Sequence, residues 1–195
     1  MGTNFFAMIS RMKYIERWAL MRNSIHENIA EHSLEVAMIA HALCLIGNKR
    51  LGKNYNAEHA AVIALYHDAP EIITGDMPTP VKYFNKEIRS SFGEIEDAAS
   101  EKLLAMLPED LSEEYRKLFF EEGTKEDKNL RKIVKAADKI SALIKCIEES
   151  KTGNLEFVKA NESTEKAIEE MHLEEADIFL KECIPSYQLT LDQLS

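Results

Sequence analysis

Apolar residues recur every three to four positions along most of this chain, and the strict apolar–polar alternation of a β-strand is nearly absent. In residues 126–149, for example, Leu130, Ile133 and Ala137 fall on one helical face. This pattern is typical of amphipathic α-helices that bury one side. It predicts an all-α fold with helices at residues 4–14, 28–47, 57–69, 86–106, 112–121, 126–149 and 155–182.

Interruptions of the pattern predict the links between these helices. Residues 16–28 are irregular, and Gly47 is expected to end the second helix. Pro70 disfavours helical geometry at the residue before it, so the chain is expected to kink or restart there. Residues 72–80 contain one glycine and two prolines and are predicted to form a loop. No repeat or shift in composition divides the sequence, so residues 1–195 are predicted to form a single domain.

Composition and charge narrow the range of functions. The formal net charge of −10 argues against nucleic-acid binding, because that function needs a basic face to displace counterions. No apolar stretch approaches the ~20 residues that span a bilayer, and the amino terminus lacks a signal-peptide pattern, so no membrane association is expected. The three cysteines, Cys44, Cys146 and Cys183, are far apart and typical of reduced thiols. A cytoplasmic protein is therefore expected.

Four ionisable residues lie where apolar neighbours predict burial. His67 and Asp68 follow the apolar run at residues 60–66. His32 shares a face with the core positions of the second predicted helix, and Asp138 lies at the edge of the apolar stripe of the sixth. Burying a charge costs several kcal/mol unless it is paired or bound to a metal. Two imidazoles and two carboxylates suit a first-row divalent cation better than calcium or an iron–sulfur cluster.

Each of these residues also has an ordinary structural explanation. A single histidine on a core face is usually hydrogen-bonded, the His67-Asp68 pair could cap a helix, and Asp138 could pair with Lys135. The joint pattern favours one shared cation, because three separate helices each present an acid or an imidazole toward an apolar face.

Longer strings of residues carry a resemblance to known proteins. The order His32, His67-Asp68 and Asp138 resembles the HD-domain metal-dependent phosphohydrolases. A more specific resemblance, to the bacterial 5′-deoxynucleotidase branch, rests on strings at residues 10–22, 31–33, 67–71 and 74–85. The similarity extends past Ala137-Asp138 to residue 186, and so covers almost the whole chain.

The resemblance implies a helical HD bundle with a metal site between its helices. It implies hydrolysis of 2′-deoxyribonucleoside 5′-monophosphates to deoxynucleoside and phosphate, with Co²⁺, Mn²⁺ or another first-row divalent cation as cofactor. It also implies a homodimer. By match of position, the metal ligands are His32, His67, Asp68 and Asp138.

The resemblance further assigns an acid/base role to Glu71 and substrate contacts to Arg17, Trp18, Asp76 and His32, the last of these also a metal ligand. Phosphate monoesters hydrolyse very slowly without catalysis, so strong charge stabilisation is needed. Two ligand carboxylates formally cancel a dication, and we therefore expect Arg17 or Lys82 to assist at the phosphate. The flat indole of Trp18 is expected to lie against the sugar and to disfavour a 2′-hydroxyl.

Other functions remain open at this point. A zinc-protease motif is excluded, because the position four residues after His26 is Ala30. An HD triphosphohydrolase would need a basic polyphosphate channel, and a cyclic-nucleotide phosphodiesterase would need further histidines, for which His26 and His41 are poor candidates. A non-catalytic nucleotide-binding HD module would have no need of Glu71.

Overall fold

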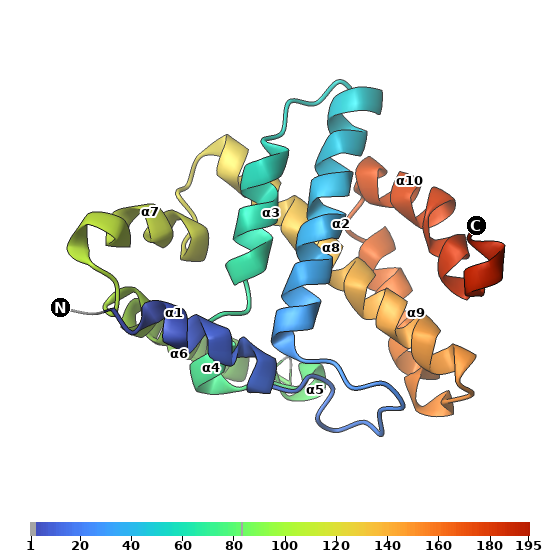
Figure 1. Cartoon of the computed structure of the whole chain (residues 1–195), viewed down its shortest axis with the longest axis horizontal. Helices are drawn as coiled ribbons and strands as arrows, with labels where there is room; N and C mark the ends of the chain where they lie inside the picture. Colours follow the sequence, from blue (N-terminus) through green and yellow to red (C-terminus); the bar gives the residue numbers. More distant parts are fainter. Residues whose placement is uncertain (1–2, 83) are drawn as a thin grey trace.

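The computed structural model describes residues 3–82 and 84–195, and within these residues every regular element is helical (Figure 1). The longer helices are α2 (Ile29–Arg50), α3 (Ala57–Tyr66), α6 (Lys86–Leu104), α7 (Glu109–Phe119), α8 (Lys125–Lys151), α9 (Val158–Glu169) and α10 (Glu174–Glu182). The short ones are α1 (Phe5–Ile9), η1 (Ser10–Tyr14), α4 (Glu71–Thr74), α5 (Thr79–Lys82), η2 (Leu155–Phe157), η3 (Ile184–Gln188) and η4 (Leu191–Gln193). The all-α prediction is confirmed. Met1, Gly2 and Tyr83, the last within one of the matching strings, lie outside the described residues.

Helix α2 is the centre of the molecule and packs against α3 and α8 (Figure 1). It begins with a capping box: the Asn28 side chain accepts hydrogen bonds from the backbone of Ala30 and Glu31, and Glu31 reaches back to the Asn28 N–H. Buried aliphatic residues of these three helices form the larger of two hydrophobic clusters, with Val36, Leu43, Ile63, Ile133, Ile140 and Ile144 among its members. This packing fixes the three helices relative to one another.

The smaller hydrophobic cluster joins the amino-terminal segment to α6 through Phe5, Met12, Leu103 and Leu104. Three aromatic side chains contact both clusters: Tyr66, Tyr115 and Phe119. The Tyr66 and Tyr115 rings meet edge to face at 5.7 Å between centroids. The two clusters are therefore connected by aromatic packing.

Helix α2 is the one helix of the described residues whose length and composition resemble those of a membrane span. By length and composition alone it could cross a bilayer, since its most apolar window has a mean hydropathy of 1.5. Charged residues at its two ends, Glu31 and Glu35 and then Lys49 and Arg50, interrupt the apolar run, so no apolar stretch in it approaches the ~20 residues of a membrane span. Half of this window is buried inside the fold, as a central core helix requires.

The structure differs from the sequence prediction at Gly47 and in the glycine- and proline-containing segment at residues 72–80. Gly47 does not end its helix, which continues to Arg50; a Cβ there would lie 2.7 Å from the Tyr55 ring, so close packing requires the glycine. The predicted loop at residues 72–80 is irregular only at 75–78, because α4 and α5 form single helical turns on either side. Pro70 does restart the chain, as the residue immediately before α4.

The last predicted helix, 155–182, is interrupted. It consists of η2, α9 and α10, and the chain turns at His172, whose φ is +48°. Neither glycine nor proline marks this turn in the sequence. The turn lets α9 bury Ile168 and α10 bury Phe179 against the same cluster, so tertiary packing decides the break.

Candidate active site

The four predicted metal ligands converge from three helices. His32 lies in the second turn of α2, His67 and Asp68 follow directly after α3, and Asp138 lies midway along α8. His32 Nε2 is 3.1 Å from Asp138 Oδ1 and 3.5 Å from Asp68 Oδ2. His67 Nε2 is 3.2 Å from the same Asp68 oxygen. One potential ligand atom from each of His32, His67 and Asp68 lies within 4.8 Å of the others.

These side chains fit a divalent cation. The Nδ1–H of His67 donates to the carbonyl of Ala64 at 2.7 Å, which leaves Nε2 as its free ring nitrogen. That Nε2 is buried and makes no hydrogen bond. A backbone bond that fixes a histidine ring from behind is typical of metal-ligating histidines. Two imidazoles and the Asp68 carboxylate, with Asp138 Oδ1 beside His32 Nε2 at 3.1 Å, form a donor set that suits a first-row divalent cation.

Neighbouring charges in the cluster shift the pKa values of His67 and Asp68. Burial would raise the pKa of Asp68, but the neighbouring His67 holds it far below its ordinary range. Burial lowers the pKa of His67, and the Asp68 carboxylate outweighs this and raises it to about 9. The positive charge that stabilises the Asp68 carboxylate in this way is the kind of charge that a bound cation would supply.

A hydrogen-bond relay fixes His32 from the outer side. Its Nδ1 lies 3.0 Å from Ser141 Oγ, and Ser141 donates to Glu35 Oε2 at 2.6 Å. The His32 side chain has no exposed surface. Ser141, three residues after Asp138 on α8, was not among the predicted site residues. Glu35, three residues after His32, was missed, although its i+3 spacing from a buried histidine was the available signal.

Glu71 is the first residue of α4 and is 7% exposed. Its Oε2 is buried without a hydrogen-bond partner. Burial and the charges of Asp68 and Asp76 raise the pKa of Glu71 to about 10. Burial also raises the pKa of Asp76, which lies just beyond α4. Both carboxyl groups are close enough to Asp68 for its charge to raise their pKa values.

Arg17 and Trp18 lie on the irregular segment before α2. Arg17 Nη1 is 2.5 Å from His32 Nδ1 and donates to Glu27 Oε1 at 3.1 Å. Trp18 Nε1 donates to Glu27 Oε2 at 2.6 Å, and the indole packs on Phe157 at 5.3 Å between ring centroids. The segment therefore brings a cation and a flat ring beside the metal cluster.

A cavity of about 660 Å³ opens next to these residues. Arg17, Trp18, Asp76 and Asp138 line it on the cluster side. The opposite wall comes from α9, through Lys159, Ala160, Ser163, Thr164 and Ala167. Its volume lies within the usual range for small-molecule sites. Sequence analysis missed the α9 wall and Lys139, which also lines the cavity, because only the fold brings α9 to this place.

Lys82 takes a different position from the other predicted substrate contacts. It is not among the residues that line the cavity, and its Nζ donates to Glu96 Oε1 at 2.8 Å. Its charge still lowers the pKa of Glu71. A direct contact between Lys82 and substrate remains a prediction.

Comparison with known proteins agrees with this geometry. The family described as 5′-deoxynucleotidase YfbR-like matches residues 4–187. A 5′-deoxynucleotidase of Vibrio vulnificus is 48% identical over 193 residues, which cover 99% of this chain and 98% of the relative. The 5′-deoxynucleotidase YfbR of Escherichia coli is 46% identical over the same length and is 96% covered.

Solved structures share the fold. An HD-domain phosphohydrolase from Listeria innocua superposes with a TM-score of 0.80 at 27% identity, over 94% of this chain and 88% of that one. A cyanophage S-2L HD phosphohydrolase, described as bound to dA and one catalytic Zn²⁺, superposes with a TM-score of 0.65 at 18% identity, over 92% and 96% of the two chains. The family match over nearly the whole chain and the histidine–aspartate cluster around the buried His32 lead to one conclusion: this chain belongs to the YfbR-like 5′-deoxynucleotidases, metal-binding HD-domain enzymes that hydrolyse phosphoric monoesters.

Proposed function

We propose that this 5′-deoxynucleotidase acts on 2′-deoxyribonucleoside 5′-monophosphates with a divalent cation held by His32, His67, Asp68 and Asp138. The observation that carries the proposal is the buried Nε2 of His67, which has no hydrogen-bond partner and faces the carboxylate of Asp68. When bound, such a cation polarises a phosphoryl oxygen and lowers the pKa of a water molecule.

The donor set supports Co²⁺, Mn²⁺ or another first-row divalent cation. Imidazole nitrogen favours the transition metals, and carboxylate oxygen keeps manganese within range. The cyanophage phosphohydrolase of the same fold was obtained with zinc, a member of the same series. We propose Co²⁺ and Mn²⁺ as the activating ions of this enzyme.

Glu71 is proposed as the acid/base residue. It is buried beside Asp68, and its unpartnered Oε2 is available to a water molecule or to the leaving 5′-oxygen. A carboxyl group whose pKa is raised by burial carries a proton that it can donate to a departing alkoxide. Asp76 lies on the cavity wall, and we assign it to orienting the substrate.

Arg17 is proposed to hold the phosphate. Its guanidinium keeps its charge, because burial lowers its pKa but the surrounding carboxylates, Glu27 first among them, raise it above the ordinary value. In a protein with a net charge of −10, a cation at this wall offsets the overall field against an anionic substrate. His32 lies against Arg17 and is proposed to border the phosphate as well as to bind the metal.

Trp18 is proposed to select deoxyribose. Its indole forms part of the cavity wall next to Arg17, where the sugar of a bound nucleotide would lie. A rigid ring at van der Waals distance from C2′ leaves no room for a hydroxyl group.

Phosphate release tests this function. The chelated protein should be inactive toward dAMP, and added Co²⁺ or Mn²⁺ should restore hydrolysis to deoxyadenosine and phosphate. AMP, dATP and cyclic AMP serve as competing substrates in the same assay. Faster hydrolysis of dATP or cyclic AMP than of dAMP would replace the proposal with the corresponding HD activity. Binding of dAMP without turnover under every metal would indicate a nucleotide-binding module.

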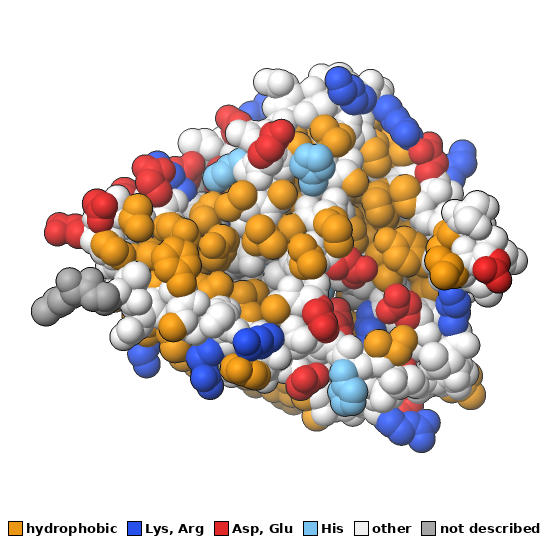
Figure 2. Space-filling view, in the orientation of Figure 1, with side chains coloured by type: hydrophobic (Ala, Val, Ile, Leu, Met, Phe, Trp, Pro, Cys, Tyr) orange, Lys and Arg blue, Asp and Glu red, His pale blue; other side chains and the backbone are white. Residues whose placement is uncertain are grey.

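The enzyme is further proposed to be a homodimer. Leu34, Met38 and Leu45 are 55%, 59% and 41% exposed and follow one face of α2. Val62 and Leu65 of α3 are also exposed, and hydrophobic side chains gather over α2 and α3 in Figure 2. Such a patch suits a second copy of the same apolar face.

Light scattering on size-exclusion fractions tests the dimer. Met38→Glu should produce monomers, whereas Leu191→Glu, at an exposed carboxy-terminal residue, should not change the mass. A monomeric parent protein at micromolar concentration would refute the dimer. We also propose a cytoplasmic enzyme, which the three unpaired cysteines support.

A further inference from the structure

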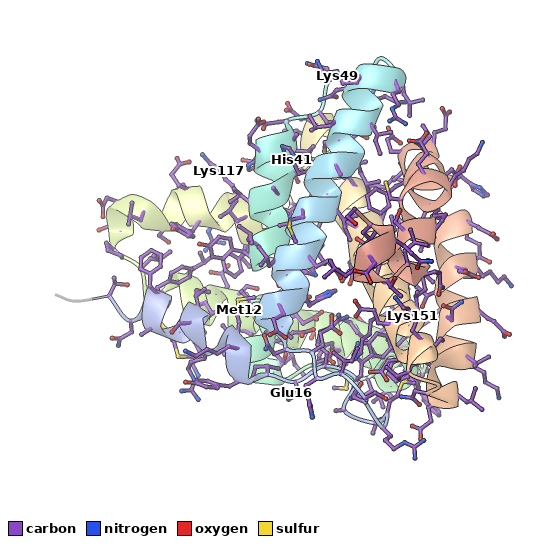
Figure 3. All side chains as sticks on the ribbon, turned by 45° about the vertical axis from the view of Figure 1, so that its right-hand side comes forward. Met12, Glu16, His41, Lys49, Lys117 and Lys151 are labelled. Carbon is purple, nitrogen blue, oxygen red and sulfur yellow. The ribbon has the colours of Figure 1, made fainter. Side chains whose placement is uncertain are left out.

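The segment at residues 16–28 forms a loop that closes on itself. Glu16 and Asn28 form an isolated bridge, and the Arg17 N–H donates to the Glu27 carbonyl at 2.9 Å. Figure 3 labels Glu16 at the start of this loop, which leads from η1 into α2 in Figure 1. The two ends of the loop therefore place Arg17 and Trp18 directly opposite Glu27.

Trp18 has a backbone conformation that needs external support. Its φ is +61°, in the left-handed region that residues other than glycine seldom adopt. Such a conformation persists only where the surroundings over-determine it, and it is concentrated at functional sites. The indole of Trp18 contacts Phe157 and Glu27, and its carbonyl oxygen accepts from the Met21 N–H at 2.9 Å.

Glu27 divides its two carboxylate oxygens between the two residues. Oε1 accepts from Arg17 and also lies 3.6 Å from His32 Nδ1, and Oε2 accepts from Trp18. The side chains of Arg17 and Glu27 are each 12% exposed, so the ion pair is shielded from water. Glu27 does not line the large cavity, and it therefore acts on substrate only through its neighbours.

We propose that Glu27 is the positioning residue that sets Arg17 and Trp18 together, so that phosphate binding and exclusion of a 2′-hydroxyl depend on one buried carboxylate. This inference rests on the roles given to Arg17 and Trp18 under the proposed function. No resemblance or comparison assigns a role to Glu27.

The rest of the loop has a separate attachment, which makes the role of Glu27 local. Glu149 accepts hydrogen bonds from the backbone of Ser24 and Ile25 and from the side chains of Lys145 and Asn154. These contacts hold the far end of the loop against α8. Removing Glu27 should therefore release Arg17 and Trp18 without detaching the loop.

The first test uses Trp18 as its own reporter, because it is the only tryptophan in the chain. Fluorescence of the full-length, metal-free protein is compared with that of Glu27→Ala, Glu27→Gln and Glu148→Ala. Glu148 borders the same small acidic pocket as Glu27 but has no bond to Arg17 or Trp18, so it is the matched control. Glu27→Ala should shift the emission to the red and raise acrylamide quenching at least twofold. Glu27→Gln keeps an acceptor for the indole N–H and should resemble the parent.

The second test separates binding from turnover. Glu27→Ala should raise KM for dAMP about tenfold or more and reduce the preference for dAMP over AMP about tenfold, with kcat changed less than threefold. Glu27→Gln removes the charge opposite Arg17 and should raise KM while restoring the preference. Glu148→Ala should match the parent in each quantity.

Two results would overturn the inference. The first is a Glu27→Ala variant whose fluorescence emission and KM for dAMP both equal those of the parent. If Glu27→Ala fails to fold, the second is a Glu27→Gln variant whose KM for dAMP equals that of the parent. Fluorescence decides whether Glu27 holds Trp18 even if Trp18→Ala leaves the preference for deoxyribose intact. Failure of the proposed sugar contact and failure of the positioning role are thus distinguishable.

Discussion

The metal cluster and the loop at residues 16–28 lie side by side but are held in opposite ways. The cluster residues come from long core helices, and one buried nitrogen, His67 Nε2, has no hydrogen-bond partner. The loop has no regular structure between Glu16 and Asn28, yet Glu27 and Glu149 satisfy its polar groups through several hydrogen bonds. The cluster lies on core helices and keeps a ligand nitrogen without a partner, whereas the loop is irregular and, apart from the buried Oδ1 of Asn23, is held by hydrogen bonds to Glu27 and to Glu149 of α8.

This difference separates two parts of the function. A rigid group of ligand side chains suits chemistry that must be the same for every substrate. A loop fixed by side-chain bonds suits selection, because a change at one bond moves a contact without disturbing the core. Substitutions in the cluster should therefore abolish turnover, and substitutions in the loop should alter affinity and preference.

The largest effect is expected at the cluster. Asp68→Ala removes a carboxylate that approaches both His32 and His67, so metal content should fall well below stoichiometric and kcat for dAMP should drop more than about a thousandfold. Elemental analysis and phosphate release measure the two effects. Asp97→Ala, at an exposed residue of α6, is the control and should retain both. Full activity in Asp68→Ala would show that the metal cluster does not carry the reaction, and its contrast with the loop would then have no functional meaning.

A somewhat smaller loss is expected at Glu71. Glu71→Gln should reduce kcat by about a hundredfold to ten-thousandfold, the usual range for removal of a general acid or base. Metal content should stay near that of the parent, since Glu71 is not among the clustered ligand residues. A variant that loses metal together with activity would show that Glu71 belongs to the cluster rather than to the reaction.

Because Glu149 holds the loop against α8, the free energy of unfolding should depend on pH. Burial would raise the pKa of Glu149, but hydrogen bonds from Lys145, Asn154 and the loop backbone lower it from 4.5 to about 2. Since the pKa is depressed in the folded state, this stabilisation is complete above pH 4.5 and is lost as the pH falls toward 2. It amounts to roughly 3 kcal/mol, or about a hundredfold in the unfolding equilibrium.

Urea unfolding of the parent and of Glu149→Gln measures this contribution. The variant should be less stable at pH 7, and the difference should shrink between pH 4.5 and pH 2. Glu148→Gln, its exposed neighbour, should show no comparable gap. A difference in stability that is constant with pH would mean that the Glu149 charge does not fasten the loop.

The smallest effect is expected at the indole. Trp18→Ala should reduce the preference for dAMP over AMP about tenfold, equivalent to about 1.4 kcal/mol, while kcat for dAMP changes little. Ratios of kcat/KM for the two nucleotides measure it. Phe157→Leu, which removes only the ring beneath Trp18, should have a partial effect in the same direction. Unchanged discrimination in Trp18→Ala would separate sugar selection from this loop.

Much of this site was accessible from local sequence. Apolar residues spaced three and four positions apart place His32 and Asp138 on helices. The His67-Asp68 pair is recognisable because it ends an apolar run. The kink at Pro70, which starts α4 at Glu71, follows from the chemistry of the ring. These features depend on neighbours in the chain, so the chain alone specifies them.

Other features depend on residues that are distant in sequence. Gly47 was expected to end a helix, and only the position of Tyr55 explains its place inside α2. The turn at His172 has no local signal and exists because α9 and α10 pack on the same core. The cavity wall on α9 and the bonds of Glu27 likewise arise from long-range packing.

By itself, then, the sequence determined an all-helical chain with four ligand-type side chains on helices and a conspicuous Arg17-Trp18 pair, because helix periodicity and burial cost act over a few residues. Tertiary structure decided which atoms meet. It places the unpartnered Nε2 of His67 near Asp68, bonds Trp18, with its left-handed backbone conformation, to Glu27, and brings α9 to the opposite wall of the cavity. Such contacts join residues far apart in the chain, and only the packing of the core helices sets the distances between them.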